Sequence, residues 1–338
     1  MMDGLRVPIV AAPMAGGVST PELVVAVGAA GGLGFLATGY LSPDRVKSQI
    51  DRVRSLSRCR FGVNLFVPGE PAVADLTAYR ALVAEQGRPL GASPGEPRWE
   101  DDDYHAKLAL LLDDPVPVVS FTFGLPSAQD VRRLQQAGSR VVGTVTTPAE
   151  AAAAESVGVD ALCLQGIEAG GHRAVFTDDG HTEAGGPAHP LLDLIRLVRG
   201  QSALPLIAAG GLTDGRDLAA ALAAGAQAGQ FGTALLRTPE AGTRPAHRLA
   251  LTQRRKTALT RAFTGRPARG LVNEMMLALT DQAPAAYPEV HHLTAPVRAA
   301  AGAAEDPERM SAWAGLGADT TSDRPAAELV TAWDAEAR

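Results

Sequence analysis

The sequence predicts an α/β fold, a closed (β/α)8 TIM barrel with a small helical appendage after the eighth strand. Short apolar runs rich in branched residues recur eight times within the first 236 residues. Each run is followed by a turn signal and then by an amphipathic or alanine-rich stretch of helical pattern. The runs are apolar almost throughout, which is typical of parallel strands that helices cover on both faces. Together these features favour a closed barrel over an open doubly wound sheet.

The expected strands follow one another along the chain with a helical stretch after each. They are Pro8–Met14, Leu33–Gly39, Phe61–Val67, Val116–Gly124, Arg140–Thr146, Ala161–Gly166, Leu204–Gly211 and Gly229–Leu236. Several helical stretches begin with an N-cap residue or an early proline, as in Ser19-Thr20-Pro21 and Thr147-Pro148. In a barrel, this order places the carboxyl end of every strand on one rim, where ligands bind in this fold.

The stretch from Leu23 to Pro43 carries no charged residue and is long enough to resemble a membrane span. Five glycines interrupt it, and the pair Gly31-Gly32 suits a helix end better than the centre of a bilayer helix. We therefore expect a helix, a turn and a buried strand here, and no membrane partner.

Two segments depart from the alternation of strands and helices. Residues 86–103 are rich in proline and glycine and carry an acidic run, which predicts an exposed loop or, alternatively, a mobile lid. Residues 241–285 are helical in pattern, and we expect them to form a small appendage over the barrel mouth. The domains predicted are therefore a barrel over residues 1–240, this appendage, and C-terminal helices over residues 286–338 that pack back on the barrel.

Charge and cysteine content exclude several classes of protein. The net charge is −6 and the charged residues are dispersed, so nucleic acid is not an expected partner. Cys59 and Cys163 lie too far apart for a disulfide framework or a thiolate zinc site, which fits a reducing cytoplasm. The start, Met1 to Pro8, lacks the apolar stretch of a secretory signal.

The candidates for chemistry follow the predicted strands on the rim. The small residues of Ala12-Pro13-Met14 let a planar ligand approach the backbone, although a tight turn explains them equally well. Asn64 is an amide inside an apolar strand, and it needs a partner from the core or from a polar heterocycle. Gly170-Gly171 before His172 can aim the imidazole over the mouth, where it takes a proton or, when protonated, stabilises negative charge.

Glycines follow the seventh and eighth predicted strands, at Gly210-Gly211 and Gly232. Barrels commonly bind phosphate there with backbone N–H groups, so we expect a phosphate-bearing ligand, although glycines at barrel corners are also ordinary. No metal is expected, because one loop-like stretch holds several possible ligands in no compact motif. These are His172, Asp178, Asp179, His181, Glu183 and His189.

Six motifs, in order along the barrel, resemble the nitronate monooxygenase family, formerly called 2-nitropropane dioxygenase. They are APMAGG at Ala12–Gly17, FGVNLFVP at Phe61–Pro68, SFTFGLP at Ser120–Pro126, QGIEAGGHR at Gln165–Arg173, AAGG at Ala208–Gly211 and GQFGTALL at Gly229–Leu236. The similarity continues at Tyr287-Pro288 and Trp313-Ala314-Gly315. This resemblance implies an FMN-dependent barrel enzyme that oxidises small anionic alkyl nitronates, such as propionate 3-nitronate, with dioxygen and without NAD(P)H. The products implied are a carbonyl compound and nitrite.

The resemblance also implies roles for residues that match the family's motifs. His172 corresponds to the catalytic histidine, and Phe66, Phe123 and Tyr287 are candidates for the substrate pocket. The residues expected to contact FMN are Ala12, Pro13, Met14, Asn64, Gln165, Gly170, Gly171, Gly210, Gly211, Gln230, Phe231, Gly232 and Thr233.

Departures from the family's pattern leave alternatives open. Ala11 stands where the family usually has glutamine, and Ala174 stands where it often has glycine. One alternative is an FMN-dependent enoyl-acyl-carrier-protein reductase that uses NAD(P)H, which shares the Glu-Ala-Gly-Gly-His stretch. The other is a non-catalytic FMN-binding module. The oligomeric state is open between monomer and homodimer.

Overall fold

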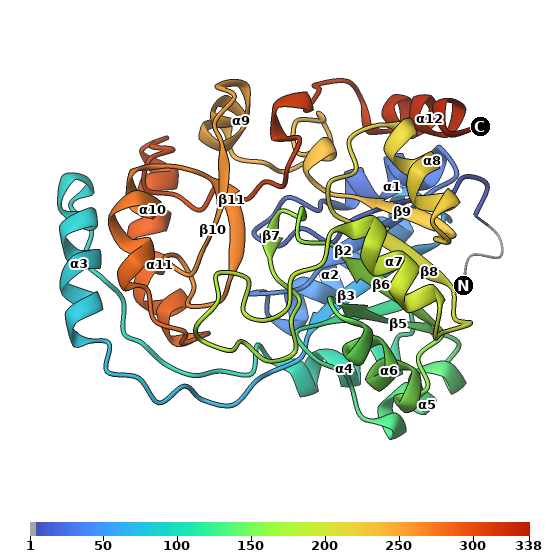
Figure 1. Cartoon of the computed structure of the whole chain (residues 1–338), viewed down its shortest axis with the longest axis horizontal. Coiled ribbons are helices and arrows are strands. Elements are labelled where there is room, and N and C mark those ends of the chain that lie inside the picture. Colours follow the sequence, from blue (N-terminus) through green and yellow to red (C-terminus); the bar gives the residue numbers. More distant parts are fainter. Residues whose placement is uncertain (1–4) are drawn as a thin grey trace.

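Eight parallel strands close into a barrel in the computed structural model, which describes residues 5–338 (Figure 1). The barrel order is β1-β2-β3-β4-β5-β6-β8-β9, and β1 closes on β9 with Val10 opposite Gln230. The strands are β1 (Ile9–Ala11), β2 (Leu33–Ala37), β3 (Phe61–Phe66), β4 (Val118–Thr122), β5 (Arg140–Val145), β6 (Ala161–Gln165), β8 (Leu206–Ala209) and β9 (Ala228–Phe231). Each predicted run overlaps one of these strands, so the predicted fold class is confirmed.

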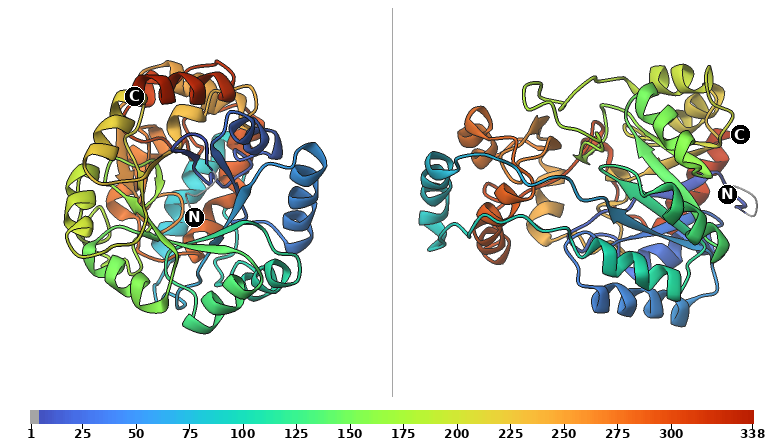
Figure 2. Two further views of the ribbon diagram at one scale, coloured as in Figure 1. Left: turned by 90° about the vertical axis from the view of Figure 1, so that its right-hand side faces the viewer. Right: turned by 90° about the horizontal axis from the view of Figure 1, so that it is seen from below.

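A ring of helices covers the outside of the barrel (Figure 2, left). The helices are α1 (Pro21–Ala29), α2 (Pro43–Leu56), α4 (Tyr104–Asp113), α5 (Ala128–Gln136), α6 (Pro148–Val157), α7 (Leu191–Arg199) and α8 (Gly215–Ala223). Side-chain oxygens of Thr20, Thr147 and Asp214 accept backbone N–H groups at the starts of α1, α6 and α8, as N-caps do. None of the helices between residues 5 and 338 is long and apolar enough to span a membrane.

The uncharged stretch from Leu23 to Pro43 forms the end of α1, a turn and the buried strand β2, as predicted. The beginning of the chain, at Met1 to Gly4, lies outside the described residues, so the structure says nothing of the predicted lack of a secretory signal there.

The lower half of the barrel interior is filled by side chains. Phe35, Val142 and Ile207 belong to a buried cluster inside the strands. Gly62 makes room for Phe35, because a Cβ at Gly62 would lie 2.2 Å from the Phe35 ring. Small and polar residues follow at the carboxyl ends of the strands, so the barrel interior leaves space for a ligand at that rim.

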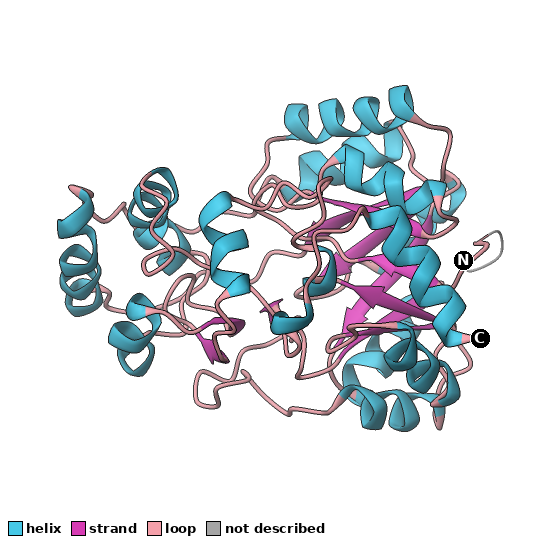
Figure 3. Cartoon of the chain, turned by 90° about the horizontal axis from the view of Figure 1, so that it is seen from above, coloured by secondary structure: helices cyan, strands magenta, loops and turns pink. Residues whose placement is uncertain are grey.

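A separate layer covers this rim and forms the left part of the molecule in Figures 1 and 3. Its helices are α3 (Thr77–Gly87), η1 (Arg88–Leu90), α9 (Pro245–Thr252), α10 (Glu274–Leu279), η3 (Thr280–Gln282) and α11 (Glu289–Ala303). Its sheet has the order β10-β11-β7 and consists of β7 (Gly171–His172), β10 (Thr257–Thr260) and β11 (Ala268–Leu271). A second hydrophobic core, with Tyr79 of α3 and Leu293 of α11, holds this layer together.

The prediction that residues 241–285 are helical is wrong for β10 and β11. Their strand character depends on pairing, since β11 lies between β10 and β7 and is about 95 residues away from β7 in the chain, with Ala268 opposite His172. Neighbouring residues along the chain therefore carry little signal for it.

The C-terminal residues divide between the two parts of the molecule. α11 packs against α3 in the layer over the rim, whereas α12 (Ala326–Ala337) packs against α1 and α8 on the barrel. The short helices η2 (Thr233–Leu235) and η4 (Ala318–Thr320) lie close to one another between these parts.

Residues 91–103 run back from the rim layer to α4 without regular structure (Figure 1). Contacts anchor this segment at both ends. The Gly95 N–H donates to the carbonyl oxygen of Leu293 at 2.9 Å, and Asp102 forms a 2.8 Å ion pair with the buried Lys107.

Candidate active site

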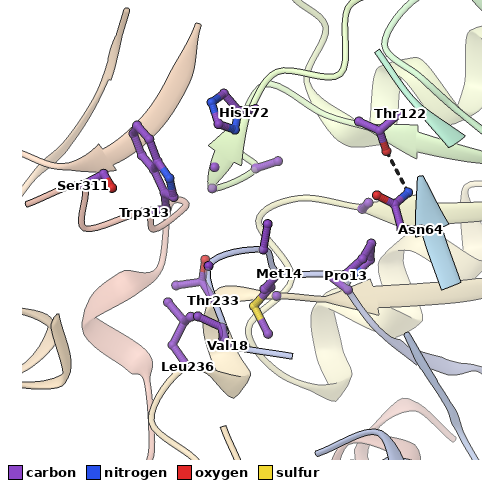
Figure 4. Close-up of a pocket in the computed structure, with 18 of the residues that line it drawn as sticks. Pro13, Met14, Val18, Asn64, Thr122, His172, Thr233, Leu236, Ser311 and Trp313 are labelled. Atoms are coloured by element: carbon purple, nitrogen blue, oxygen red, sulfur yellow. Dashed lines mark hydrogen bonds between the residues drawn. The ribbon is translucent and has the colours of Figure 1, made fainter. Parts of the chain in front are cut away.

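A cavity of about 410 Å³ lies between the carboxyl ends of the barrel strands and the layer that covers them. Loops after the strands and helices α9 and α11 both contribute to its walls. Almost all the residues predicted for the site line this cavity (Figure 4). They are Ala12, Pro13, Met14, Asn64, Phe66, Phe123, Gln165, Gly170, Gly171, His172, Gly210, Gly211, Gln230, Gly232 and Thr233.

Two predicted residues are placed differently. The Phe231 ring is buried on the outside of the barrel and stacks on Trp333 of α12, with ring centroids 4.3 Å apart. Because successive side chains of a strand point to opposite faces, Gln230 faces the cavity and Phe231 cannot. Tyr287 does not line the cavity either, but its ring lies behind the wall, 5.7 Å from Phe123 and 5.9 Å from His172.

His172 lies on β7, where pairing with β11 fixes its backbone between barrel and cover. Its Nε2 lies 2.9 Å from the hydroxyl of Thr264. Burial, with the nearby charges of Arg266 and Arg298, lowers the pKa of His172 to about 3. The imidazole is therefore neutral near pH 7, which favours the predicted proton acceptor over the predicted imidazolium.

Aromatic rings surround His172 and make the upper wall of the cavity apolar. Phe123 and Trp313 lie 5.7 and 5.4 Å from the imidazole, centroid to centroid, and Phe66 packs against Phe123 at 4.5 Å. The Arg266 guanidinium lies 3.9 Å over the Phe123 ring, a cation–π contact. Such walls exclude water and suit a planar ligand.

The two amides at the barrel floor have different environments. The Asn64 Nδ2 lies 2.9 Å from Ser120 Oγ and 3.0 Å from Thr122 Oγ1, and no bond from a described residue occupies its Oδ1. By contrast, Gln165 donates to the carbonyl oxygen of His172 at 2.9 Å and accepts from the Ala174 N–H at 2.9 Å. Gln165 thus ties the end of β6 to the loop that carries His172.

Glycines allow close backbone approach in the loops that follow β6, β8 and β9. A Cβ on Gly170 would lie 2.4 Å from the backbone nitrogen of Gly315, so only glycine allows these loops to meet. Gly210 and Gly211 have φ of 110° and 73°, which other residues rarely adopt. A Cβ on Gly232 would meet no protein atom nearer than 3.5 Å and would extend into the cavity space.

Several cavity residues were not predicted from the sequence. Tyr40 has φ of 67°, and its ring stacks on His291 at 4.1 Å. Arg298, two turns after His291 on α11, also lines the cavity, and so do His247 of α9 and Arg244 at its N-cap. Trp313 belongs to a family motif to which the sequence assigns no role, and it lines the cavity as well. No described aspartate or glutamate lines the cavity.

The possible metal ligands after β7 do not form a common site. Asp178 pairs with Arg261, and Asp179 accepts backbone N–H groups of His181 and Thr182 at 2.9 Å each. Among residues 5–338, no three histidine, cysteine, aspartate or glutamate side chains lie close enough together to hold a metal ion.

Comparisons with known proteins agree over nearly the whole chain. Residues 1–333 match the family model described as nitronate monooxygenase. A protein of Pseudomonas aeruginosa named nitronate monooxygenase is 42% identical over 97% of this chain and 95% of its own length. Another of that name, from Paraburkholderia phytofirmans, is 40% identical over 98% of this chain and 93% of its own.

Solved structures extend this similarity to the fold. A nitroalkane oxidase from Streptomyces ansochromogenes is 48% identical and superimposes with a TM-score of 0.96 over 99% of this chain and 96% of its own. FabK from Thermotoga maritima is 26% identical, with a TM-score of 0.74 over 99% of this chain and 94% of its own.

Proposed function

The chain belongs to the nitronate monooxygenase family and is an enzyme of that activity, and from this premise we propose that it binds FMN at the barrel mouth and oxidises small alkyl nitronates. Members of this family are generally flavin-dependent. Two nitronates and one dioxygen balance two carbonyl compounds and two nitrite ions, so the reaction needs no NAD(P)H.

The cavity supports this proposal, because different groups in its walls suit the flat ring, the polar ring edge and the phosphate of FMN. The floor at Ala12, Pro13 and Met14 leaves room for a flat ring, and Asn64 Oδ1 can accept a hydrogen bond from its polar edge. Gly211 and Gly232 would hold the phosphate with backbone N–H groups, and a side chain on Gly232 would enter the space that the phosphate needs. Bound there, the flavin supplies electron transfer between nitronate and dioxygen.

We assign proton transfer to His172. Thr264 Oγ1 lies 3.3 Å from the carbonyl oxygen of Arg266, which it reaches only as a donor. With its proton placed there, Thr264 accepts from the His172 Nε2–H, and Nδ1 is the basic nitrogen. A neutral imidazole in this tautomer can remove the α-proton of a nitroalkane or bind a protonated substrate.

We propose a separate role for each part of the chain. The barrel, residues 1–240, binds the cofactor, and residues 241–285 with α11 cover the substrate and exclude water. The remainder of residues 286–338 joins this cover to the barrel. The free thiols of Cys59 and Cys163 support a cytoplasmic location, where thiols stay reduced.

An oxygen electrode tests the proposed function. We expect ethylnitronate to cause oxygen uptake with release of nitrite, at a rate that NADPH does not increase. If NADPH reduces the flavin under anaerobic conditions faster than ethylnitronate does, the reductase alternative is correct instead. Full flavin occupancy without turnover of either substrate would indicate a non-catalytic module.

A further inference from the structure

Arg298 is a half-buried cation that lines the cavity without an anionic partner among the described residues. It lies on α11, and no described aspartate or glutamate oxygen comes within 4.0 Å of its guanidinium. Burial lowers the pKa of Arg298 only to about 10, so the side chain stays charged near neutral pH. A charge that is partly removed from water without an opposite charge beside it is costly, and this cost is expected where a ligand supplies the opposite charge.

Hydrogen bonds fix the orientation of this guanidinium. The Nε donates to Thr294 Oγ1 at 2.9 Å, and Nη2 donates to the His291 carbonyl oxygen at 3.0 Å and lies 3.2 Å from its Nδ1. No described residue accepts from Nη1. One edge of the guanidinium is thus held by α11, and the remaining nitrogen is available to a ligand in the cavity.

The positive charge of Arg298 acts on the side chains beside the position proposed for the substrate. It is one of the two cations that lower the pKa of His172, and it also lowers that of His291. The other cation, Arg266, stacks on Phe123 and donates to the carbonyl oxygens of Arg173 and Val175. Since His172 itself is neutral, an anion beside it needs a positive charge from elsewhere, and Arg298 is the cavity-lining cation whose charge acts on the imidazole.

We propose that Arg298 binds the negatively charged nitro oxygens of the nitronate and is the residue that selects the anionic substrate. This role rests on the proposed function. The nitronate loses negative charge when it is oxidised, so Arg298 stabilises the bound substrate more than the transition state. Its removal should therefore raise KM rather than lower kcat.

Steady-state kinetics with ethylnitronate test this role in three variants. Arg298→Met should raise KM roughly 10- to 100-fold, the range for a hydrogen bond to a charged group, with kcat within about threefold of wild type. Arg298→Lys keeps the charge and should recover part of the affinity. The matched control is Arg132→Met, which removes an exposed cation on α5 away from the cavity and should change KM less than about twofold.

A binding experiment separates this proposal from the proposed function, because it needs no turnover. Sodium nitrate, a planar anion that cannot be oxidised, should perturb the flavin spectrum of wild type and of Arg132→Met but bind at least tenfold more weakly to Arg298→Met. If wild type binds nitrate but turns over no nitronate, the proposed activity fails while the anion site stands.

Two results would overturn the role of Arg298. One is a KM and a nitrate affinity within about twofold of wild type in Arg298→Met. The other is loss of FMN from this variant without a change in KM, which would mean that Arg298 holds the cofactor phosphate. If Arg298→Met does not fold, Arg298→Gln can still donate to Thr294 and decides the question by the same criteria.

Discussion

At the scale of single residues, the chemistry of the site depends on which cavity side chains are charged and which are neutral. The cavity has a neutral imidazole at His172, a charged guanidinium at Arg298 and no described carboxylate. Gln165 holds the backbone carbonyl of His172 at 2.9 Å, so the ring is oriented from the barrel side as well as by Thr264. A site of this kind binds an anion and keeps a base beside it.

The substitution His172→Ala should preserve flavin binding and lower kcat/KM for nitroethane, whose α-proton must be removed, by about 10²- to 10⁴-fold, as expected for loss of a positioned acid–base group. Flavin content by absorbance and oxygen uptake measure the two effects separately. Turnover near the wild-type rate would rule out the assigned role.

The substitution Gly232→Asp should lower the FMN content of the purified protein, because a carboxylate would enter the space proposed for the phosphate. The matched control is Gly69→Asp, at an exposed glycine where an added Cβ would meet no atom within 4 Å. The ratio of flavin to protein absorbance compares the two. Equal flavin content would move the phosphate to another part of the cavity.

The residues at the ends of barrel strands were predictable, because their place on the rim follows from the order of strands alone. His172, Asn64 and Gly232 are of this kind, and all line the cavity. Arg298 was not predictable, since it reaches the cavity only through the packing of α11 over the rim. Phe231 was misplaced because sequence motifs do not say which face of a strand a side chain takes.

At the scale of elements, an ion pair fastens the irregular segment 91–103 to the barrel. Lys107 on α4 is 1% exposed in its side chain, and it contacts Asp102 at 2.8 Å and the Thr38 carbonyl oxygen at 3.1 Å. Asp102 in turn accepts the backbone N–H of Tyr40 at 2.7 Å. The segment therefore holds the turn that places the Tyr40 ring on His291.

The substitution Lys107→Met should cost about 3 kcal/mol of stability, because it leaves Asp102 without its cation in a largely buried place. The double variant with Asp102→Asn should recover a large part of this loss. Urea denaturation at pH 7 of both single variants and the double variant measures the coupling. Additive losses would show that the pair does not stabilise this anchor.

The barrel elements were predicted from local signals, whereas the elements of the cover were not. Each barrel strand is an apolar run with its own turn and cap signals, as at Thr147 before α6. The strands β10 and β11 are four residues each, and their partner β7 has only two residues. Such short strands exist because of tertiary pairing, and no periodic pattern marks them.

At the scale of the whole molecule, enclosing histidines under the cover makes stability depend on pH. Burial lowers the pKa of His172 to about 3 and of His247 to about 4, and it also lowers that of His291, against an ordinary value of 6.5. The unfolded chain then binds protons more readily than the folded chain. Above pH 6.5 these histidines are neutral in both states, so they do not lower the free energy of unfolding. As pH falls from 6.5 toward the folded pKa values, the unfolded chain takes up protons that the folded chain does not, and the free energy of unfolding falls.

The flavin-free protein should therefore be less stable to urea at pH 5 than at pH 7, by about 1.4 kcal/mol for each such histidine per pH unit below 6.5. Asp102 opposes this trend, because burial raises its pKa to about 6 and the folded chain binds its proton more tightly. His247→Gln should reduce the difference between the two pH values. Equal stability at pH 5 and pH 7 would contradict the neutral state of these side chains.

At the same scale, we propose that one cavity brings flavin and nitronate together, and the visible absorption spectrum during an anaerobic titration with ethylnitronate tests this most directly. We predict a yellow protein whose oxidised flavin bands disappear as ethylnitronate is added and return when air is admitted. A colourless protein that takes up no FMN, or flavin bands that ethylnitronate leaves unchanged, would contradict the account.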